Sequence, residues 1–380
     1  MDEIFMRRAI ELARKGEGFT SPNPCVGAVI VKGGRIISEG YHERVGADHA
    51  EIVAIKQMMQ KSGIVTVDIE PTLFHNATLY VTLEPCSHTG RTPPCVKAVA
   101  AAGFSKVVIG MRDPFKKVNG RGISYLKKHG IKVSVLNPVS KLAEEVRVIN
   151  QPFIKSMTEG LPYLTLKAGL SLDGKIASET KDSKWITNEK SRLDAKLERS
   201  KCDAVIIGAG TVINDNPELA AIGQYKSKNL LRVIVGDKML FDQDLKVFRD
   251  KNVLIACSDS VSAKLKKSFI DASISIKSFG KKRVSFKKLL KYLVSKNIQS
   301  VFVEGGSSMN GSLFDENLVD MKLIDRVLFY YAPKLIGGAK SISVVGGNGV
   351  EKISQSIEIS RSKVDFIDGD LKYTGLINFF

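Results

Sequence analysis

The chain has little of what marks membrane or secreted proteins. No uncharged apolar run approaches the roughly 20 residues that a transmembrane helix needs, and residues 2–13 show a charged, amphipathic pattern unlike a secretory leader. The five cysteines are too irregularly spaced for a disulfide framework; they stand at Cys25, Cys86, Cys95, Cys202 and Cys257. We therefore expect a protein of the reducing cytoplasm that has no membrane partner.

The excess of basic charge is spread along the chain. With 380 residues the chain is long enough for two domains with separate cores, and its net charge is +17. Residues 1–150 hold 21 Lys and Arg against 14 Asp and Glu, or +7, which leaves 36 against 26, or +10, for the remainder. This spread fits anionic small substrates better than a nucleic-acid-binding face, so we expect a small-molecule enzyme and keep nucleic acid as the alternative partner.

Two short motifs carry the strongest chemical signal. Residues 49–51 read His-Ala-Glu, and Cys86 and Cys95 follow in a Pro-rich segment. One imidazole and two thiolates are good zinc ligands, and three ligands leave the fourth position of a tetrahedral ion open for water, as in catalytic sites. Such a water loses its proton near neutral pH, and Glu51 is placed to carry that proton to a leaving group. The order of the motifs is that of zinc deaminases.

The flanking patterns place these residues at the ends of secondary-structure elements. Apolar residues at helical spacing between 52 and 59 predict a helix whose first turn holds the His-Ala-Glu motif. The alternating run 77–83 predicts a strand that ends just before Cys86. Two prolines predict that Cys95 opens a helix, where the helix dipole favours a thiolate. Strand end and helix starts are therefore expected to converge on one ion.

Two other interpretations compete with a catalytic zinc site. Cysteines in a cytosolic chain are most often buried small residues. In a second interpretation His88 joins His49, Cys86 and Cys95 in a closed structural site, which leaves Glu51 without a role. The joint presence of all the motifs in the deaminase order favours the catalytic site.

The element pattern predicts two α/β domains, residues 1–147 and 148–380. The first is predicted to be a three-layer α/β/α domain with a Gly33-Gly34 hairpin, strands at 106–110 and 131–136, and a helix near 121–129. The second is predicted to hold a mostly parallel sheet with strands at 163–168, 204–208, 231–236, 252–256 and 300–304, and helices near 189–200, 285–296 and 310–319.

Glycine-rich turns follow two strands of the second domain. Residues 302–308 run from a buried strand through Gly305-Gly306 towards a helix, and Gly208-Ala-Gly-Thr leaves another strand. The backbone N–H groups of such a turn, together with the N-terminus of the next helix, bind phosphate groups. Because Gly-Gly after a strand is at least as often an ordinary turn, both interpretations stay open.

Over essentially all 380 residues the chain resembles the bifunctional riboflavin-biosynthesis enzymes that join a diaminohydroxyphosphoribosylaminopyrimidine deaminase to a 5-amino-6-(5-phosphoribosylamino)uracil reductase. In the first domain the resemblance rests on Pro22-Asn-Pro-Cys-Val-Gly, on Gly40-Tyr-His, and on the segment from Thr82 to Cys95, whose eight-residue gap between cysteines is longer than in most nucleic-acid and cytidine deaminases. In the second domain it rests on Ser171-Leu-Asp-Gly-Lys, Ser183-Lys-Trp-Ile-Thr, Gly210-Thr-Val, Asp215-Asn-Pro and Val303-Glu-Gly-Gly.

This resemblance implies a cytidine-deaminase-like first domain and a dihydrofolate-reductase-like second domain. It implies that His49, Cys86 and Cys95 bind one zinc ion, that Glu51 moves protons, and that the pyrimidine loses its exocyclic amine as ammonia. The implied contacts to the deaminase substrate are Asn23, His42, His88 and Arg91.

For the second domain the resemblance implies hydride transfer from NADPH to C1 of the opened ribosyl group, which yields a ribityl chain. The implied substrate contacts are Ser183, Arg199, Leu219 and Glu304. The implied cofactor contacts are Gly169, Trp185, Thr211, Asp215, Gly306, Ser307, Ser308, Met309, Asn310, Gly311 and Ser312. By residue type alone Trp185, the sole Trp, equally suits a hydrophobic core.

One position departs from the family pattern. After Asp-Asn-Pro the family usually continues Leu-Thr-x-Arg, and this chain has Ile222 where that Arg, suited to the substrate phosphate, would stand. We expect Arg199, Arg232, Lys226 or Lys228 to compensate. An unchanged reductase KM after removal of all four charges would contradict this expectation.

The favoured function is thus a bifunctional enzyme that acts on a phosphoribosyl-pyrimidine. A deaminase of nucleic-acid bases with an unrelated second domain is the alternative, followed by a non-catalytic zinc module. Either enzyme is compatible with a homo-oligomer.

Overall fold

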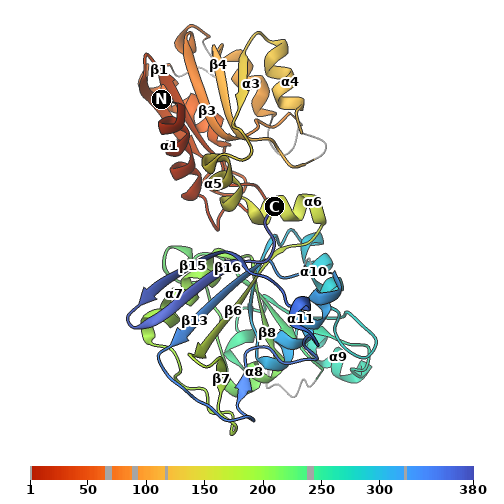
Figure 1. Cartoon of the computed structure of the whole chain (residues 1–380). Helices are drawn as coiled ribbons and strands as arrows, with labels where there is room; N and C mark the ends of the chain where they lie inside the picture. The colour runs from red at the N-terminus through yellow and green to blue at the C-terminus, as the bar shows by residue number, and fades with distance from the viewer. Residues whose placement is uncertain (1, 65–70, 88–92, 116–118, 238–243, 321–322) are drawn as a thin grey trace. The chain divides into compact units, whose positions relative to one another are not determined.

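The computed structural model describes residues 2–64, 71–87, 93–115, 119–237, 244–320 and 323–380. Its contacts divide the chain into two compact units, residues 1–159 with Phe380 and Gly160–Phe379 (Figure 1). Each unit is described by itself below.

The first unit extends further than the boundary placed after residue 147. Helices α5 (Lys141–Ile149) and α6 (Gln151–Glu159) follow each other across Asn150. The buried Asn150 accepts a hydrogen bond from the Cys25 N–H at 2.8 Å and donates one to the Cys25 carbonyl at 3.1 Å. This pair of bonds fixes the junction to the first unit, so α6 begins there and not in the second unit.

The described strands of the first unit form a five-stranded sheet in the order β2-β1-β3-β4-β5. Strand β1 pairs antiparallel with β2 and β3, and the β3-β4 and β4-β5 pairs are parallel. The strands are β1 (Gly27–Lys32), β2 (Arg35–Tyr41), β3 (Ala77–Leu83), β4 (Lys106–Met111) and β5 (Lys132–Val135). The predicted hairpin is confirmed: Gly33 and Gly34 have φ of 57° and 74°, as a type I′ turn requires.

Helices cover both faces of this sheet. Helices α1 (Asp2–Arg14) and α5 share one apolar cluster with strand residues such as Val29 and Val31. The other face packs against α2 (Ala50–Lys61), α3 (Cys95–Ala101) and α4 (Arg121–Lys128) through Ile30, Leu79 and their neighbours. The three-layer α/β/α architecture expected for this domain is confirmed.

The second unit is built on a nine-stranded sheet of the described residues, in the order β11-β10-β9-β8-β12-β6-β13-β16-β15. The run from β11 to β13 is parallel, and β16 and β15 add two antiparallel strands at one edge. The strands are β6 (Tyr163–Ser171), β8 (Ala204–Gly208), β9 (Leu231–Val235), β10 (Val253–Cys257), β11 (Ser275–Ser278), β12 (Ser300–Glu304), β13 (Arg326–Ala332), β15 (Ser360–Ile367) and β16 (Asp370–Leu376). A small sheet pairs β7 (Lys175–Ala177) with β14 (Ile342–Ser343).

The helices of the second unit divide between the two faces of the sheet. One face packs against α10 (Phe286–Ser295) and α11 (Ser307–Asp320), and the other against α7 (Glu189–Lys201), α8 (Ala209–Asp215) and α9 (Ala263–Asp271). The mostly parallel α/β sheet predicted for this half is therefore confirmed. Within the described ranges no helix is both long and apolar enough to span a membrane.

A polar network fixes α7 to the antiparallel edge. Glu198 pairs with Arg326 of β13 at 3.1 Å, and Asp194 accepts hydrogen bonds from Lys372 of β16 and from the Tyr330 hydroxyl, each at 2.6 Å. Burial opposes ionisation of Glu198, but the nearby cations, first of all Arg326, outweigh it and lower its pKa to about 2. The network therefore holds α7 in one rotational setting against the sheet.

Candidate functional site

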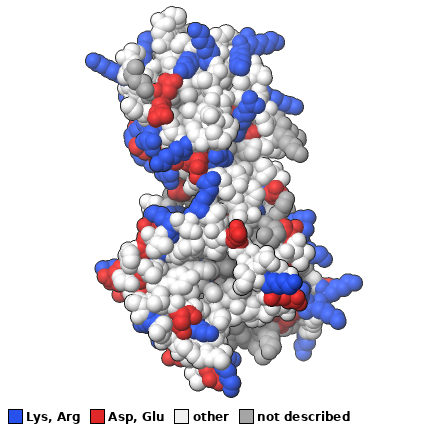
Figure 2. All heavy atoms as spheres, in the orientation of Figure 1, with Lys and Arg blue, Asp and Glu red and all other residues white. Residues whose placement is uncertain are grey.

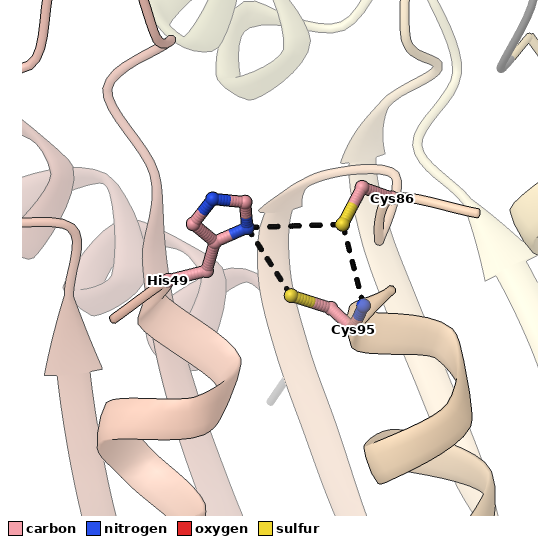
Figure 3. Close-up of side chains that lie close together, drawn as sticks. All are labelled: His49, Cys86 and Cys95. Atoms are coloured by element: carbon pink, nitrogen blue, oxygen red, sulfur yellow. Dashed lines mark hydrogen bonds between the residues drawn. The ribbon is translucent and has the colours of Figure 1, made fainter. Parts of the chain in front are cut away.

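The three predicted zinc ligands converge on one point of the first unit. Figure 3 shows the side chains of His49, Cys86 and Cys95 pointing toward one another. The His49 Nδ1 atom lies 3.2 Å from the Cys95 Sγ atom and 3.8 Å from the Cys86 Sγ atom, and the three donor atoms lie within 4.8 Å of one another. Among the described residues this is the group of His, Cys and acidic side chains that fits a metal ion.

Each ligand stands at the end of an element, as predicted. His49 is the N-cap of α2, Cys86 lies three residues beyond the end of β3, and Cys95 opens α3 after Pro94. The Cys95 N–H donates to the Cys86 Sγ atom at 3.3 Å, and the next N–H donates to the Cys86 carbonyl at 3.2 Å. These hydrogen bonds join the end of β3 to the start of α3 independently of a metal ion.

The spacing of the donor atoms fits a tetrahedral zinc ion. With zinc–nitrogen distances of about 2.1 Å and zinc–sulfur distances of about 2.3 Å, a nitrogen–sulfur edge measures about 3.6 Å. The two edges from the His49 ring, 3.2 and 3.8 Å, bracket that length. One imidazole and two thiols also form a donor set that zinc prefers.

The titratable groups of the cluster shift one another's pKa values. Hydrogen bonds from Cys95 and His49 lower the pKa of Cys86 to about 4, although burial opposes this shift. The hydrogen bond with Cys86 and burial raise the pKa of Cys95. Burial, reinforced by the negative charge of Cys86, raises the pKa of Glu51 to about 7. Glu51 is only 3% exposed, so its carboxyl group is almost completely shielded from solvent.

Two of the predicted deaminase contacts lie beside the cluster. The rings of His42 and His49 meet edge to face with centroids 5.2 Å apart. The His42 Nδ1–H donates to the Asp48 carbonyl at 3.0 Å, which leaves Nε2 to accept from the Asn23 amide at 3.1 Å. Burial lowers the pKa of His42, so this ring is neutral near pH 7. The other two predicted contacts, His88 and Arg91, lie outside the described residues.

Glu84 supports the site and was not predicted from the sequence. This buried carboxylate accepts hydrogen bonds from the N–H groups of Asp113, Gly120 and Ile123 at 3.3, 3.0 and 3.2 Å. It thereby ties the segment before Cys86 to the start of α4. The sequence signal for this role was an acidic residue directly after an apolar strand. A carboxylate buried there needs N–H groups that donate hydrogen bonds to it.

The two glycine-rich turns of the second unit lie side by side. They follow β8 and β12, which are parallel neighbours, and a Cβ atom at Gly208 would lie 3.9 Å from the Met309 sulfur. A Cβ atom at Gly210 or Gly306 would meet no atom within 4 Å. The fully buried Asn310, in the first turn of α11, has no hydrogen-bond partner for its Oδ1 atom. Open glycines at two helix starts suit the diphosphate of a nucleotide cofactor.

Most of the predicted cofactor contacts lie in or next to the two glycine-rich turns. Residues 306–312 form the second turn and the first half of α11, and Thr211 and Asp215 lie on α8. Asp215 pairs with Lys184 at 2.8 Å, which links α8 to Trp185. Trp185 is 63% exposed, so its interpretation as a core residue is wrong.

The segment around Trp185 is held by α7 and β6. The Arg192 guanidinium lies 4.3 Å from the centre of the Trp185 ring and donates to the Thr187 carbonyl. A Cβ atom at Gly169 would lie 3.3 Å from the Thr187 side chain, so β6 and this segment approach closely. Ser183 precedes them in an exposed stretch.

The remaining predicted substrate contacts form a second cluster. Arg199 pairs with Glu304 at 3.0 Å and donates to the Ala220 carbonyl at 3.1 Å. Leu219 lies next to this carbonyl, buried and with φ of 56°. Burial raises the pKa of Glu304, but the cations Lys167 and Arg199 outweigh it and lower the pKa below its ordinary value.

Two of the four residues expected to compensate for Ile222 are bonded to other groups of the protein. Lys228 donates to the carbonyls of Lys201 and Cys202 at 3.0 and 2.8 Å, and so caps the end of α7. Arg232 is buried, where it pairs with Asp250 and donates to the Asn252 carbonyl at 3.3 Å. These bonds within the fold leave Arg199 and Lys226 as the remaining expected sources of compensation.

The basic side chains do not form one continuous face in the view of Figure 2. Lys and Arg are scattered over both units, with Asp and Glu among them and large uncharged areas between. This is the pattern that the even division of charge along the sequence predicts.

Comparisons with known proteins match both halves of the chain. The model of the cytidine and deoxycytidylate deaminase zinc-binding region matches residues 1–111, and that of the RibD C-terminal domain matches residues 162–370. Riboflavin biosynthesis protein RibD of Bacillus amyloliquefaciens is 38% identical over 378 residues, which cover 99% of this chain and 96% of that protein. Riboflavin biosynthesis protein RibD of Escherichia coli (strain K12) is 33% identical over 384 residues, which cover 97% of this chain and 98% of that protein.

Solved structures agree along the whole length. RibD of Acinetobacter baumannii (form 1) has a TM-score of 0.84 at 31% identity, with 99% of this chain and 98% of that chain covered. The diaminohydroxyphosphoribosylaminopyrimidine deaminase/5-amino-6-(5-phosphoribosylamino)uracil reductase of Thermotoga maritima has a TM-score of 0.81 at 36% identity, with the same coverage. The chain belongs to the RibD family of riboflavin biosynthesis, in which a zinc-dependent deaminase and an NADPH-dependent reductase are joined.

Proposed function

We propose that the first unit deaminates 2,5-diamino-6-(5-phosphoribosylamino)pyrimidin-4(3H)-one, with zinc held by His49, Cys86 and Cys95. The observation that carries this proposal is the three-donor cluster beside a buried glutamate whose pKa is raised to about 7. Zinc bound at these donors supplies a Lewis acid and an activated water.

Glu51 carries the proton in this reaction. The carboxylate takes a proton from the attacking water and gives it to the exocyclic nitrogen of the pyrimidine. A carbon–oxygen bond forms, the carbon–nitrogen bond breaks, and ammonia leaves. A pKa near the working pH is what a group that both accepts and donates a proton requires.

The neighbouring polar groups orient the pyrimidine. Asn23 and the neutral His42 form a hydrogen-bonded pair beside His49, and we assign both residues to the pyrimidine pocket. We assign His88 and Arg91 to the same pocket from the family resemblance.

We propose that the second unit reduces the ribosyl group of 5-amino-6-(5-phosphoribosylamino)uracil to ribityl. NADPH, when bound, supplies the hydride to C1 of the opened sugar. The glycine turns and α11, from Gly306 to Ser312, hold the cofactor together with Gly169, Trp185, Thr211 and Asp215, and the contacts to the substrate come from Ser183, Arg199, Leu219 and Glu304. The open space at Gly210 and Gly306 and the unpaired Asn310 Oδ1 atom support this cofactor site.

We place the enzyme in the cytoplasm, acting on free phosphoribosyl-pyrimidines and not on nucleic acid. Reducing conditions there keep Cys86 and Cys95 as thiols, which zinc binding requires.

One assay tests the proposal. Zinc-loaded protein is incubated with the diaminopyrimidine ribotide, and ammonia release is followed without NADPH and NADPH oxidation with it. We expect ammonia in both mixtures and NADPH oxidation in the second. Absence of ammonia would overturn the deaminase assignment, and ammonia without NADPH oxidation the reductase assignment. Deamination of RNA or single-stranded DNA in place of the ribotide would favour a nucleic-acid deaminase.

A further inference from the structure

Helix α7 presents three cations along one stripe. Arg192, Lys196 and Arg199 stand at positions i, i+4 and i+7, which share one side of an α-helix. At one end Arg192 lies over the Trp185 ring, and at the other Arg199 pairs with Glu304. Lys196 therefore lies one helical turn from Arg192, which touches the proposed cofactor contact Trp185, and one turn from Arg199, a proposed substrate contact.

Three cations lie near Glu304. Lys167, Arg199 and Lys196 each favour the ionised form of this carboxylate and lower its pKa. Arg199 is engaged with Glu304 and with the Ala220 carbonyl. The ammonium groups of Lys167 and Lys196 form no ion pair or hydrogen bond with the residues that the structure describes, and Lys196 is exposed. Cations grouped in this way favour the binding of an anion.

The segment around Ile222 packs against the C-terminal end of α7. It has an apolar residue, Ile222, where a cation would complete the anion site. The Ile222 N–H donates to the Ser200 hydroxyl at 2.9 Å, and a Cβ atom at Gly223 would lie 3.0 Å from the Leu197 side chain. The segment therefore lies against the last turns of α7, which begin at Lys196. Lys228 and Arg232 are held by other partners, so α7 and the exposed Lys226 remain as sources of positive charge for this segment.

We propose that Lys196, together with Arg199, binds the phosphate of the reductase substrate. The proposal rests on the proposed reductase function and deepens it. The phosphate oxygens accept charge-assisted hydrogen bonds from the exposed ammonium group of Lys196 and from the Arg199 guanidinium. Arg199 stays paired with Glu304 and fixes the geometry, and Lys196 supplies the mobile charge.

The test measures reductase kcat and KM of the full chain with the phosphorylated substrate and with its dephosphorylated riboside. Lys196→Met should raise the KM for the ribotide roughly 10- to 100-fold, the usual effect of losing a hydrogen bond to a charged group, with kcat changed less than about 3-fold. Lys196→Arg should restore KM to within about 3-fold, because it keeps the charge. The KM for the riboside should be the same in wild type and Lys196→Met.

Two further variants locate the charge. Lys190→Met removes a Lys of the same helix that pairs with Asp368 on the surface, and should leave every parameter unchanged. Lys226→Met tests the exposed rival near Ile222. Inorganic phosphate should inhibit the wild type competitively and inhibit Lys196→Met at least roughly 10-fold more weakly.

The proposal is overturned if Lys196→Met leaves the ribotide KM unchanged, if it changes ribotide and riboside equally, or if Lys226→Met produces the larger effect. Failure of the reductase function itself is a different result, since wild-type protein would then oxidise no NADPH with the ribotide at all.

Discussion

At the scale of single residues, the chemistry of the first unit depends on a carboxyl group kept away from water. Glu51 is buried near Cys86, and burial and the negative charge of Cys86 both raise its pKa and favour its protonated form. The same burial that raises its pKa removes competing proton acceptors. These properties support the proton transfer that we propose for Glu51.

Replacing Glu51 by Gln should stop proton transfer without emptying the metal site. We expect ammonia release to fall roughly 100- to 10,000-fold, the usual contribution of a general acid–base group. Zinc content, measured by elemental analysis, should stay at the wild-type value because the three donor atoms are unchanged. Glu43→Gln, which alters an exposed acid nearby, should keep full activity. Equal loss of zinc and activity in Glu51→Gln would assign this residue a structural role.

The residues of the zinc site were predictable because their types and spacing carry the chemistry. His49, Cys86 and Cys95 could be assigned from the sequence and lie together in the structure. Glu84 and Lys196 could not, since their significance comes from neighbours far away in the chain. Their side chains are ordinary acids and bases until the fold places buried N–H groups or a second cation beside them.

At the scale of elements, the zinc site depends on the close approach of α4 to the end of β3. Gly122 packs so tightly that a Cβ atom would lie 2.3 Å from the Pro85 carbonyl oxygen. Pro85 adjoins Cys86, so any displacement is passed to a zinc ligand.

Gly122→Ala should therefore weaken zinc binding. Overpacking of this kind costs about 1–3 kcal/mol, so a chelator titration should remove zinc at roughly 5- to 100-fold lower chelator concentration than from wild type. Gly210→Ala is the matched control, because a Cβ atom there meets nothing within 4 Å, and zinc retention should be unchanged. An unaltered titration of Gly122→Ala would show that α4 shifts without moving Pro85.

The ionised Glu198 should stabilise the second unit in a way that depends on pH. Its folded pKa of about 2 lies below the ordinary 4.5, so its stabilisation is complete above pH 4.5 and is lost as the pH falls toward 2. Glu198→Gln should lower the free energy of unfolding by about 3 kcal/mol at pH 7, with the difference from wild type shrinking below pH 4.5. Urea unfolding followed by fluorescence of Trp185, the sole Trp, reports on this unit.

Glu189→Gln, in the exposed first turn of the same helix, is the control for this experiment. It should change the free energy of unfolding by less than about 1 kcal/mol. A difference between Glu198→Gln and wild type that stays constant from pH 7 to pH 3 would exclude the ionised carboxylate as its source.

Several strands, among them β11, β13 and β15, were not predicted from the sequence, and each was missed for a physical reason. Strand β11 has four residues, and β15 is an edge strand whose side chains are largely exposed, so neither carries a long apolar signal. Strand β13 is an apolar run that periodicity alone does not separate from a buried helix. The pairing of β13 with β6 and β16 is decided by contacts distant in the sequence. Longer or strictly alternating runs, such as β3 and β6, were predicted.

At the scale of the whole molecule, each proposed site is built from residues of one unit. The zinc ligands and Glu51 come from residues 49–95, and the cofactor and substrate contacts of the reductase come from residues 169–312. The two activities should therefore respond separately to loss of metal.

Removal of zinc by a chelator should abolish ammonia release and leave reduction of the already deaminated substrate within about 2-fold of its initial rate. NADPH oxidation with 5-amino-6-(5-phosphoribosylamino)uracil measures the second activity directly. Restored zinc should restore ammonia release, which controls for irreversible damage. A parallel loss of both activities, reversed together by zinc, would contradict independent sites.

Helix α7 couples several tasks through its rotational phase. One stripe carries Arg192, Lys196 and Arg199, and a second, at Asp194 and Glu198, is bonded to β13 and β16. Each added residue turns an α-helix by about 100°. Both stripes belong to one rigid helix, so a rotation of α7 that changed the contacts of one stripe would displace the other by the same angle. The bonds of Asp194 and Glu198 to the sheet therefore fix the direction in which Arg192, Lys196 and Arg199 point.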